Sequence, residues 1–124
     1  MTALLVALGA AAGATLRYLT GRLVHPAADA KFPWATFVVN LTGSLILGFL
    51  LQAVAARHLP DEAYALLGTG FCGALTTYST FSFEAVRLIT GRDHAWAAIY
   101  LIASVAGGLG AAFAGITIAQ ALWP

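Results

Sequence analysis

Four long apolar segments alternate with short polar turns along the chain. They run from about Ala3 to Leu23, Trp34 to Ala55, Glu62 to Thr90 and Ala95 to Leu122. A helix needs about 20 consecutive apolar residues to cross the hydrocarbon core of a bilayer, so each segment is long enough for one crossing. The pattern predicts an all-α membrane protein in which residues 1–124 form one domain of four transmembrane helices. Four crossings place both chain ends on the same side of the membrane.

The third segment departs from the composition of a simple membrane helix. Residues 68–84 read GTGFCGALTTYSTFSFE, so glycines and hydroxyl side chains fill the middle of an apolar span. Every backbone N–H and C=O in hydrocarbon must find a partner inside the protein. We therefore expect the third helix to be broken in the middle, facing other protein or a water-filled path. Small residues also serve close helix packing, and composition alone leaves both interpretations open.

Composition agrees with a membrane protein and excludes several other classes. Of the 124 residues, 60% are hydrophobic and 9% are charged, and the mean hydropathy is +0.86, whereas a soluble domain carries roughly 25% charged residues. The net charge of +1 gives no reason to expect a nucleic-acid partner. Cys72 is the only cysteine, so an intrachain disulfide and a thiolate metal cluster are excluded.

The first segment carries an arginine at membrane depth. Gly9, Gly13, Arg17 and Gly21 recur every fourth residue and share a helix face. Gly9 and Gly13 form a GxxxG pattern that favours close helix packing. Arg17 lies about one turn deeper than Arg22, where an arginine normally faces protein, water or a partner. Extension of its side chain to the interface is the alternative, and the shared glycine face favours the first interpretation.

Polar residues in the other segments allow two roles each. Thr36, Asn40 and Gly43 form one helical stripe. Asn40 could join helices by a hydrogen bond or point a donor at an anion, and its own pattern favours the first role. Glu84 could be a charge in a vestibule or an i,i+3 partner of Arg87. In the fourth segment Tyr100, Ser104 and Gly108 lie on one face, and in the first loop His25 is expected to be solvated.

Three blocks in this order resemble the bacterial fluoride channel family, the CrcB or Fluc proteins. They are GAAAGATLRY (residues 9–18), TFVVNLTGSLILG (residues 36–48) and GFCGALTTYSTFSFE (residues 70–84). The resemblance covers essentially the whole chain and favours permeation over packing for Asn40 and for the third segment. It implies a bacterial inner-membrane protein that exports fluoride passively and forms an antiparallel, dual-topology homodimer with two pores.

The resemblance also implies roles for particular residues. The fluoride pore would be lined by Asn40, Tyr78, Phe81, Thr36, Ser79, Thr80, Ser82, Tyr100 and Ser104. Arg17 and Glu84 match a vestibule or structural charge. A structural sodium ion (Na+) would be held at the dimer centre by the backbone carbonyls of Gly73 and Thr76. Tyr78 departs from the family, in which this pore aromatic is often phenylalanine, and its hydroxyl could contact the ion or only alter the rate.

The chemistry of fluoride fits these residue types. Fluoride is small and strongly hydrated, so hydroxyl and amide donors must replace its water. Phenyl ring edges carry the positive part of the ring quadrupole and can face an anion without a full charge. Conduction also requires binding that is weak enough for release.

Other functions are less consistent with the sequence. A small four-span multidrug or cation antiporter needs a carboxylate in its first helix, where this chain has Arg17 and no acid before Asp29. A non-transporting membrane assembly subunit is the second alternative, which ion flux from liposomes would distinguish. We expect no enzymatic activity, because no His or Asp lies at membrane depth to activate Ser79 or Ser82.

Two expectations concern the break and the orientation. A side chain added at Gly73 should be harmful, because glycine tolerates every backbone conformation and allows a second subunit to approach closely. The loop charges differ little between the two sides, with Arg22, Lys31 and Arg92 on one side and Arg57 on the other. This weak bias gives only a faint orientation and is compatible with insertion in both directions.

Overall fold

A computed structural model describes residues 2–23, 32–76 and 78–123 of the chain. The regular elements within these residues are all helical. They are α1 (Thr2–Leu23), α2 (Trp34–Ala55), α3 (Asp61–Tyr64), the π-helix η1 (Ala65–Cys72), α4 (Gly73–Leu75), α5 (Tyr78–Thr90) and α6 (His94–Leu122). The expected all-helical class is confirmed. His25, Asp29 and Lys31 lie outside the described residues.

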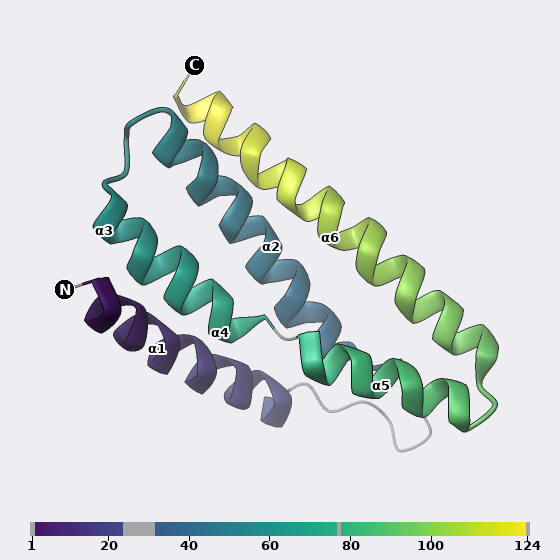
Figure 1. Ribbon diagram of the computed structural model, residues 1–124. Helices are drawn as coiled ribbons and strands as arrows, with labels where there is room; N and C mark the ends of the chain where they lie inside the picture. Colours follow the sequence, from purple (N-terminus) through teal and green to yellow (C-terminus); the bar gives the residue numbers. More distant parts are fainter. Residues whose placement is uncertain (1, 24–31, 77, 124) are drawn as a thin grey trace.

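Three of these helices are long and apolar enough to cross a membrane: α1, α2 and α6. Their ends fall within one residue of the predicted segment ends. In Figure 1 the start of α1, the end of α2 and the end of α6 lie at the same end of the bundle. The chain is therefore a multi-pass membrane protein with an α-helical architecture.

The third apolar segment consists of several elements. α3, η1 and α4 follow one another without a gap from Asp61 to Leu75, and α5 begins at Tyr78. Thr76 ends this run in an extended conformation, with φ −77° and ψ 156°. Figure 1 shows α5 set apart from α4 and lying against the lower part of α6. Thr76, which directly follows α4, is thus not helical.

Glycines set the two closest helix contacts. α1 packs along η1 and α4, and α2 packs along α6. A Cβ at Gly9 would collide with the carbonyl of Leu66, and one at Gly13 with the carbonyl of Phe71. On the other pair, a Cβ at Gly115 would collide with the carbonyl of Leu45. The backbones therefore approach at distances that only glycine permits, as the GxxxG pattern predicts.

An aromatic cluster holds α5 to the first turn of α2 and to α6. Its buried members are Phe32, Ala85, Leu88, Ala97 and Tyr100, with Phe37, Phe81 and Ala103 packed against them. The Phe32 ring meets the Tyr100 ring edge-on at 5.5 Å between centroids and 86° between planes, which is a favourable aromatic geometry. This cluster packs α5 against α6 and the start of α2.

The two glycine environments on α1 predict opposite effects of the same substitution. Gly9→Ala should lower the free energy of unfolding by about 1–3 kcal/mol, because its Cβ has no space against η1. Gly21→Ala should be neutral or stabilise by up to about 1 kcal/mol, because nothing lies within 4 Å of its Cβ and alanine is the better helix former. Reversible unfolding of both variants in detergent measures the difference, and equal effects would contradict the described α1–η1 contact.

Candidate functional site

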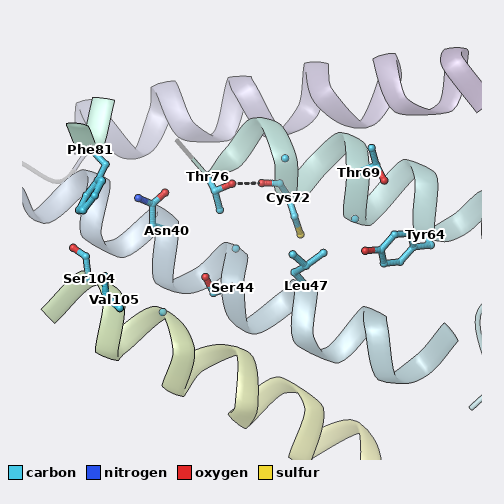
Figure 2. Close-up of a pocket in the computed structure, with 14 residues that line it drawn as sticks. Asn40, Ser44, Leu47, Tyr64, Thr69, Cys72, Thr76, Phe81, Ser104 and Val105 are labelled. Carbon is cyan, nitrogen blue, oxygen red and sulfur yellow. Dashed lines mark hydrogen bonds between the residues drawn. The ribbon is translucent and has the colours of Figure 1, made fainter. Parts of the chain in front are cut away.

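A cavity of about 600 Å³ lies between α2, the third segment and α6. We call it the central cavity, and Figure 2 shows the residues around it. Its described lining is Asn40, Gly43, Ser44, Leu47, Tyr64, Gly68, Thr69, Cys72, Gly73, Thr76, Phe81, Ser104, Val105 and Gly108. None of these residues is charged. Hydroxyl and amide groups supply the polarity of the cavity, and apolar side chains supply the rest of its wall.

One end of the central cavity brings together residues that the sequence singled out. Asn40 from α2, Phe81 from α5 and Ser104 from α6 lie at the left in Figure 2, close to Thr76. The Ser104 Oγ is buried and has no hydrogen-bond partner among the described residues. A buried hydroxyl normally has a partner, so an unsatisfied one calls for an explanation. Ser104 also lines the central cavity.

The other end of the central cavity carries polar residues that sequence reasoning missed. Tyr64 and Thr69 line it, Ser44 and Cys72 lie between the two ends, and Figure 2 shows the Tyr64 hydroxyl directed into the cavity. Ser44 could have been found, because it stands four residues after Asn40 and therefore on the same helix face. No comparable signal marks Tyr64, whose position depends on the path of the third segment.

Thr76 closes the helical part of the third segment with a double contact. Its N–H donates to the Cys72 carbonyl at 3.0 Å, and its Oγ1 donates to the same carbonyl at 2.8 Å. The threonine hydroxyl is thus used within the chain. Because Thr76 is extended, its own carbonyl turns away from the helix axis. A ligand at this point would meet the backbone oxygen of Thr76 rather than its side chain.

The structure changes what is expected of Gly73. Its backbone is helical, with φ −62° and ψ −37°, a conformation open to every residue, so the expected need for special backbone freedom is wrong. Gly73 is exposed, and a Cβ there would meet nothing within 4 Å. Neither conformation nor packing inside the chain therefore calls for glycine at this position on the cavity wall.

A second cavity of about 390 Å³ carries positive charge, and we call it the arginine cavity. Its described lining is Ala14, Arg17, Tyr18, Gly21, Arg22, Ala35, Thr36, Val39 and Thr80. Arg22 Nη1 donates to the Tyr18 hydroxyl at 3.3 Å. Arg17 is exposed, whereas Gly9 and Gly13 of the same face are buried. The deep arginine thus faces a cavity with two threonine hydroxyls, Thr36 and Thr80.

Tyr100 lies between the two cavities. Its side chain is 0% exposed, so in the single chain it does not share the cavity-facing position of Ser104. Its hydroxyl donates to Glu84 Oε1 at 3.3 Å and is hydrogen-bonded by Thr36. The Phe81 ring packs on the Tyr100 ring at 5.1 Å and 49°. Hydrogen bonds thus link Thr36, Tyr100 and Glu84, and the Phe81 ring packs on the middle residue of this polar connection.

The structure describes less of the remaining predicted site residues. Ser82 is half-buried on α5. The side chains of Tyr78 and Ser79 lie outside the described part of the structure, so their predicted roles stay predictions. The structure therefore brings Asn40, Phe81 and Ser104 into one cavity. It brings Arg17, Thr36 and Thr80 together in the arginine cavity.

Comparison with known proteins agrees with the resemblance seen in the sequence. The family model "CrcB-like protein, Camphor Resistance (CrcB)" matches residues 4–116. A fluoride-specific ion channel, FluC 1 of Streptomyces avermitilis, is 56% identical over 123 residues, which cover 99% of each chain. FluC 2 of Rhodococcus jostii, also a fluoride-specific ion channel, is 54% identical over 95% of this chain and 98% of its own.

The family match spans all of the elements that form the two cavities, and the relatives match along almost their whole length. The chain therefore belongs to the CrcB-like protein family.

Proposed function

We propose that this chain forms a fluoride-selective channel that lets fluoride leave the cell passively. The observation that carries the proposal is the central cavity, whose described lining has hydroxyl and amide groups but no charge and includes Ser104 with its unpartnered hydroxyl. Hydroxyl and amide hydrogens can replace the water around a small anion. The names of the relatives, fluoride-specific ion channels, support fluoride as that anion. Such a function is not enzymatic.

The absence of charge from the described cavity lining suits conduction rather than storage. A full positive charge at membrane depth would bind an anion too tightly for rapid release, since conduction requires weak binding. Asn40 and Ser104 offer partial charges, and the edge of the Phe81 ring offers the positive part of its quadrupole. The three groups come from α2, α6 and α5, so they surround a common space.

The arginine cavity supplies the complementary step of attracting the anion. Arg17 lies on its wall beside Thr36 and Thr80, and a cationic cleft raises the local concentration of anions. We propose that this cavity is the vestibule. The polar connection through Thr36 and Tyr100 then leads toward Phe81 and the central cavity. Tyr78 and Ser79 remain proposed members of the pore.

We further propose that the channel is an antiparallel, dual-topology homodimer in a bacterial cell (inner) membrane. Gly73 supports a close external contact, because nothing inside the chain accounts for a glycine there. A two-fold interface would bring Gly73 and Thr76 against their symmetry copies. The proposed interruption between Leu75 and Tyr78 would then be a break within the membrane, shielded by the partner rather than by lipid.

The backbone oxygens at this proposed break are suitable ligands for a structural sodium ion. The Thr76 carbonyl is turned away from the helix axis, and the Thr76 hydroxyl is already engaged with Cys72. Backbone oxygens of Gly73 and Thr76 from two chains would therefore hold the ion. When bound, sodium would offset the carbonyl dipoles that face one another, since buried polar groups without partners are costly.

Reconstitution tests the function directly. Liposomes that contain only this protein should release fluoride and retain chloride, and collapse of a proton gradient should leave the fluoride flux unchanged. A proton-coupled antiporter would stop when the gradient is removed, and an assembly subunit would show no flux alone. Equal release of both anions would overturn the proposed selectivity.

The Ser104 hydroxyl should matter for flux but not for folding. Ser104→Ala removes an unsatisfied buried hydroxyl, so the free energy of unfolding should stay the same or rise. Fluoride flux should fall about tenfold, the effect of losing one hydrogen bond to an ion. Thr42→Ala, at an exposed position of α2, is the control and should leave flux unchanged. Undiminished flux in Ser104→Ala would remove this residue from the proposed pore.

The proposed interface and sodium site share a test at Gly73. Gly73→Val should dissociate the dimer and abolish flux, although the chain alone has space for the side chain. Gly110→Val, which also meets nothing within 4 Å but does not line the cavity, is the matched control. Thr76→Ser keeps the backbone carbonyl and the hydroxyl and should retain a sodium response when sodium is exchanged for a bulky organic cation.

Cross-linking yield and fluoride flux are measured for each of these variants, with cysteine labelling of a terminus from each side of the membrane. Labelling from both sides supports dual topology, and labelling from one side only contradicts it. Full activity of Gly73→Val, or indifference to prolonged sodium removal, would overturn the proposed interface or the proposed ion site, respectively.

A further inference from the structure

Two turns at opposite ends of the bundle share an unusual backbone conformation. Arg57, which follows α2, has a φ of 62°, and Arg92, which follows α5, has a φ of 63°. Among the described residues these are the only non-glycine positions with positive φ, and no described glycine has one. Side chains rarely adopt this left-handed conformation, because their Cβ crowds the backbone. Each turn therefore holds an arginine where glycine would be the unstrained choice.

The same pair of backbone hydrogen bonds ends both helices. In the first turn Arg57 N–H donates to Val54 at 3.0 Å and His58 N–H to Ala53 at 2.9 Å. In the second, Arg92 N–H donates to Ile89 at 3.1 Å and Asp93 N–H to Leu88 at 2.8 Å. This is the Schellman motif, whose left-handed position is usually glycine.

The second turn shows that a neighbouring glycine does not take this position. Gly91 directly precedes Arg92, yet Gly91 lacks a positive φ and Arg92 adopts it. A shift of one residue would have given glycine the left-handed conformation. The strain on Arg92 is therefore a consequence of where α5 ends.

The surroundings of both arginines match a membrane interface. Both side chains are exposed. Near Arg57, the His58 ring stacks on Trp123 with 4.8 Å between centroids and 17° between planes. Near Arg92, Trp96 stands in the first turns of α6 and is 40% exposed. Tryptophan is enriched where hydrocarbon meets headgroups, so each end presents an arginine beside an interfacial aromatic.

We propose that Arg57 and Arg92 each bind the phosphate group of a phospholipid headgroup, one at each face of the membrane. A guanidinium presents several donors in a plane and binds a phosphate through two parallel hydrogen bonds. Both arginines follow the end of a helix and are exposed. Phosphate contacts at both faces then hold the two helix ends at their depth.

An alternative role needs no ligand. A cation beyond a helix C-terminus also stabilises the partial negative charge of the last carbonyls. That effect is the same with and without lipid, whereas a phosphate site adds stability only when phosphate is present. The two ends of the helix bundle are chemically alike, and this similarity also suits the proposed insertion in both orientations. The lipid site itself does not depend on fluoride conduction and would stand if that proposal failed.

Lipid titration of the purified protein distinguishes these roles. In a detergent without phosphate groups, phosphatidylglycerol should raise the unfolding temperature, and native mass spectrometry should count the bound lipid. Arg57→Asn and Arg92→Asn remove the charge but tolerate the left-handed conformation. Each should weaken phosphatidylglycerol binding about tenfold, equivalent to the loss of one charge-assisted hydrogen bond. Arg87→Gln, at an exposed arginine of the last turn of α5, is the control and should bind like the parent.

Glycine at the same positions gives a prediction of opposite sign. Arg57→Gly and Arg92→Gly should unfold at the same or a higher temperature than the parent in detergent alone, because the backbone strain is relieved. Both should nevertheless lose the stabilisation by phosphatidylglycerol. A lipid response equal to that of the parent in the double variant, Arg57→Gly with Arg92→Gly, would overturn the proposal. Equal destabilisation of the asparagine variants with and without lipid would assign the arginines to the helix ends alone, and an equal response to inorganic phosphate would overturn the lipid as ligand.

Discussion

The need to pair backbone groups inside a membrane governs the third segment. A helix that stops in hydrocarbon leaves carbonyls without partners, and each is costly there. Here the Cys72 carbonyl receives both the N–H and the hydroxyl of Thr76. The chain can therefore leave helical geometry at Thr76 with this acceptor satisfied. Phe81, which follows on α5, lines the central cavity together with Asn40.

The π-helix η1 lies shortly before Thr76 in the chain. A π-helix is rare beyond a single turn and is often found at functional sites, yet η1 extends from Ala65 to Cys72. Its wider turns lie against α1, where Gly9 and Gly13 leave room for the carbonyls of Leu66 and Phe71. The opposite side of η1 presents Gly68, Thr69 and Cys72 to the central cavity. Close backbone packing on one side thus supports an irregular, cavity-lining backbone on the other.

The sequence predicted those features that follow from local chemistry. The apolar lengths predicted α1, α2 and α6, and the glycine spacing predicted close packing at Gly9 and Gly13. The π-helix was not predicted, because no residue pattern in the sequence marks it. For the same reason Tyr64 was missed, and Gly73 was credited with a conformation that it does not adopt. The predicted pore residues stay a prediction, and only the fold shows that those it describes are divided between two cavities.

The distribution of charge follows the cost of desolvation. The described lining of the central cavity carries only dipoles, while Arg17 lies in the arginine cavity and Arg57 and Arg92 end their helices at opposite faces. A fixed charge next to water is solvated and attracts ions over several ångströms, whereas the same charge in a dry cavity would hold an anion or demand a counter-charge. In the proposed channel, partial charges in the central cavity and full charges in the arginine cavity would allow an anion to be collected and still released. This arrangement requires helices whose depth in the membrane is fixed, since a shift of one turn would move an arginine from water into hydrocarbon.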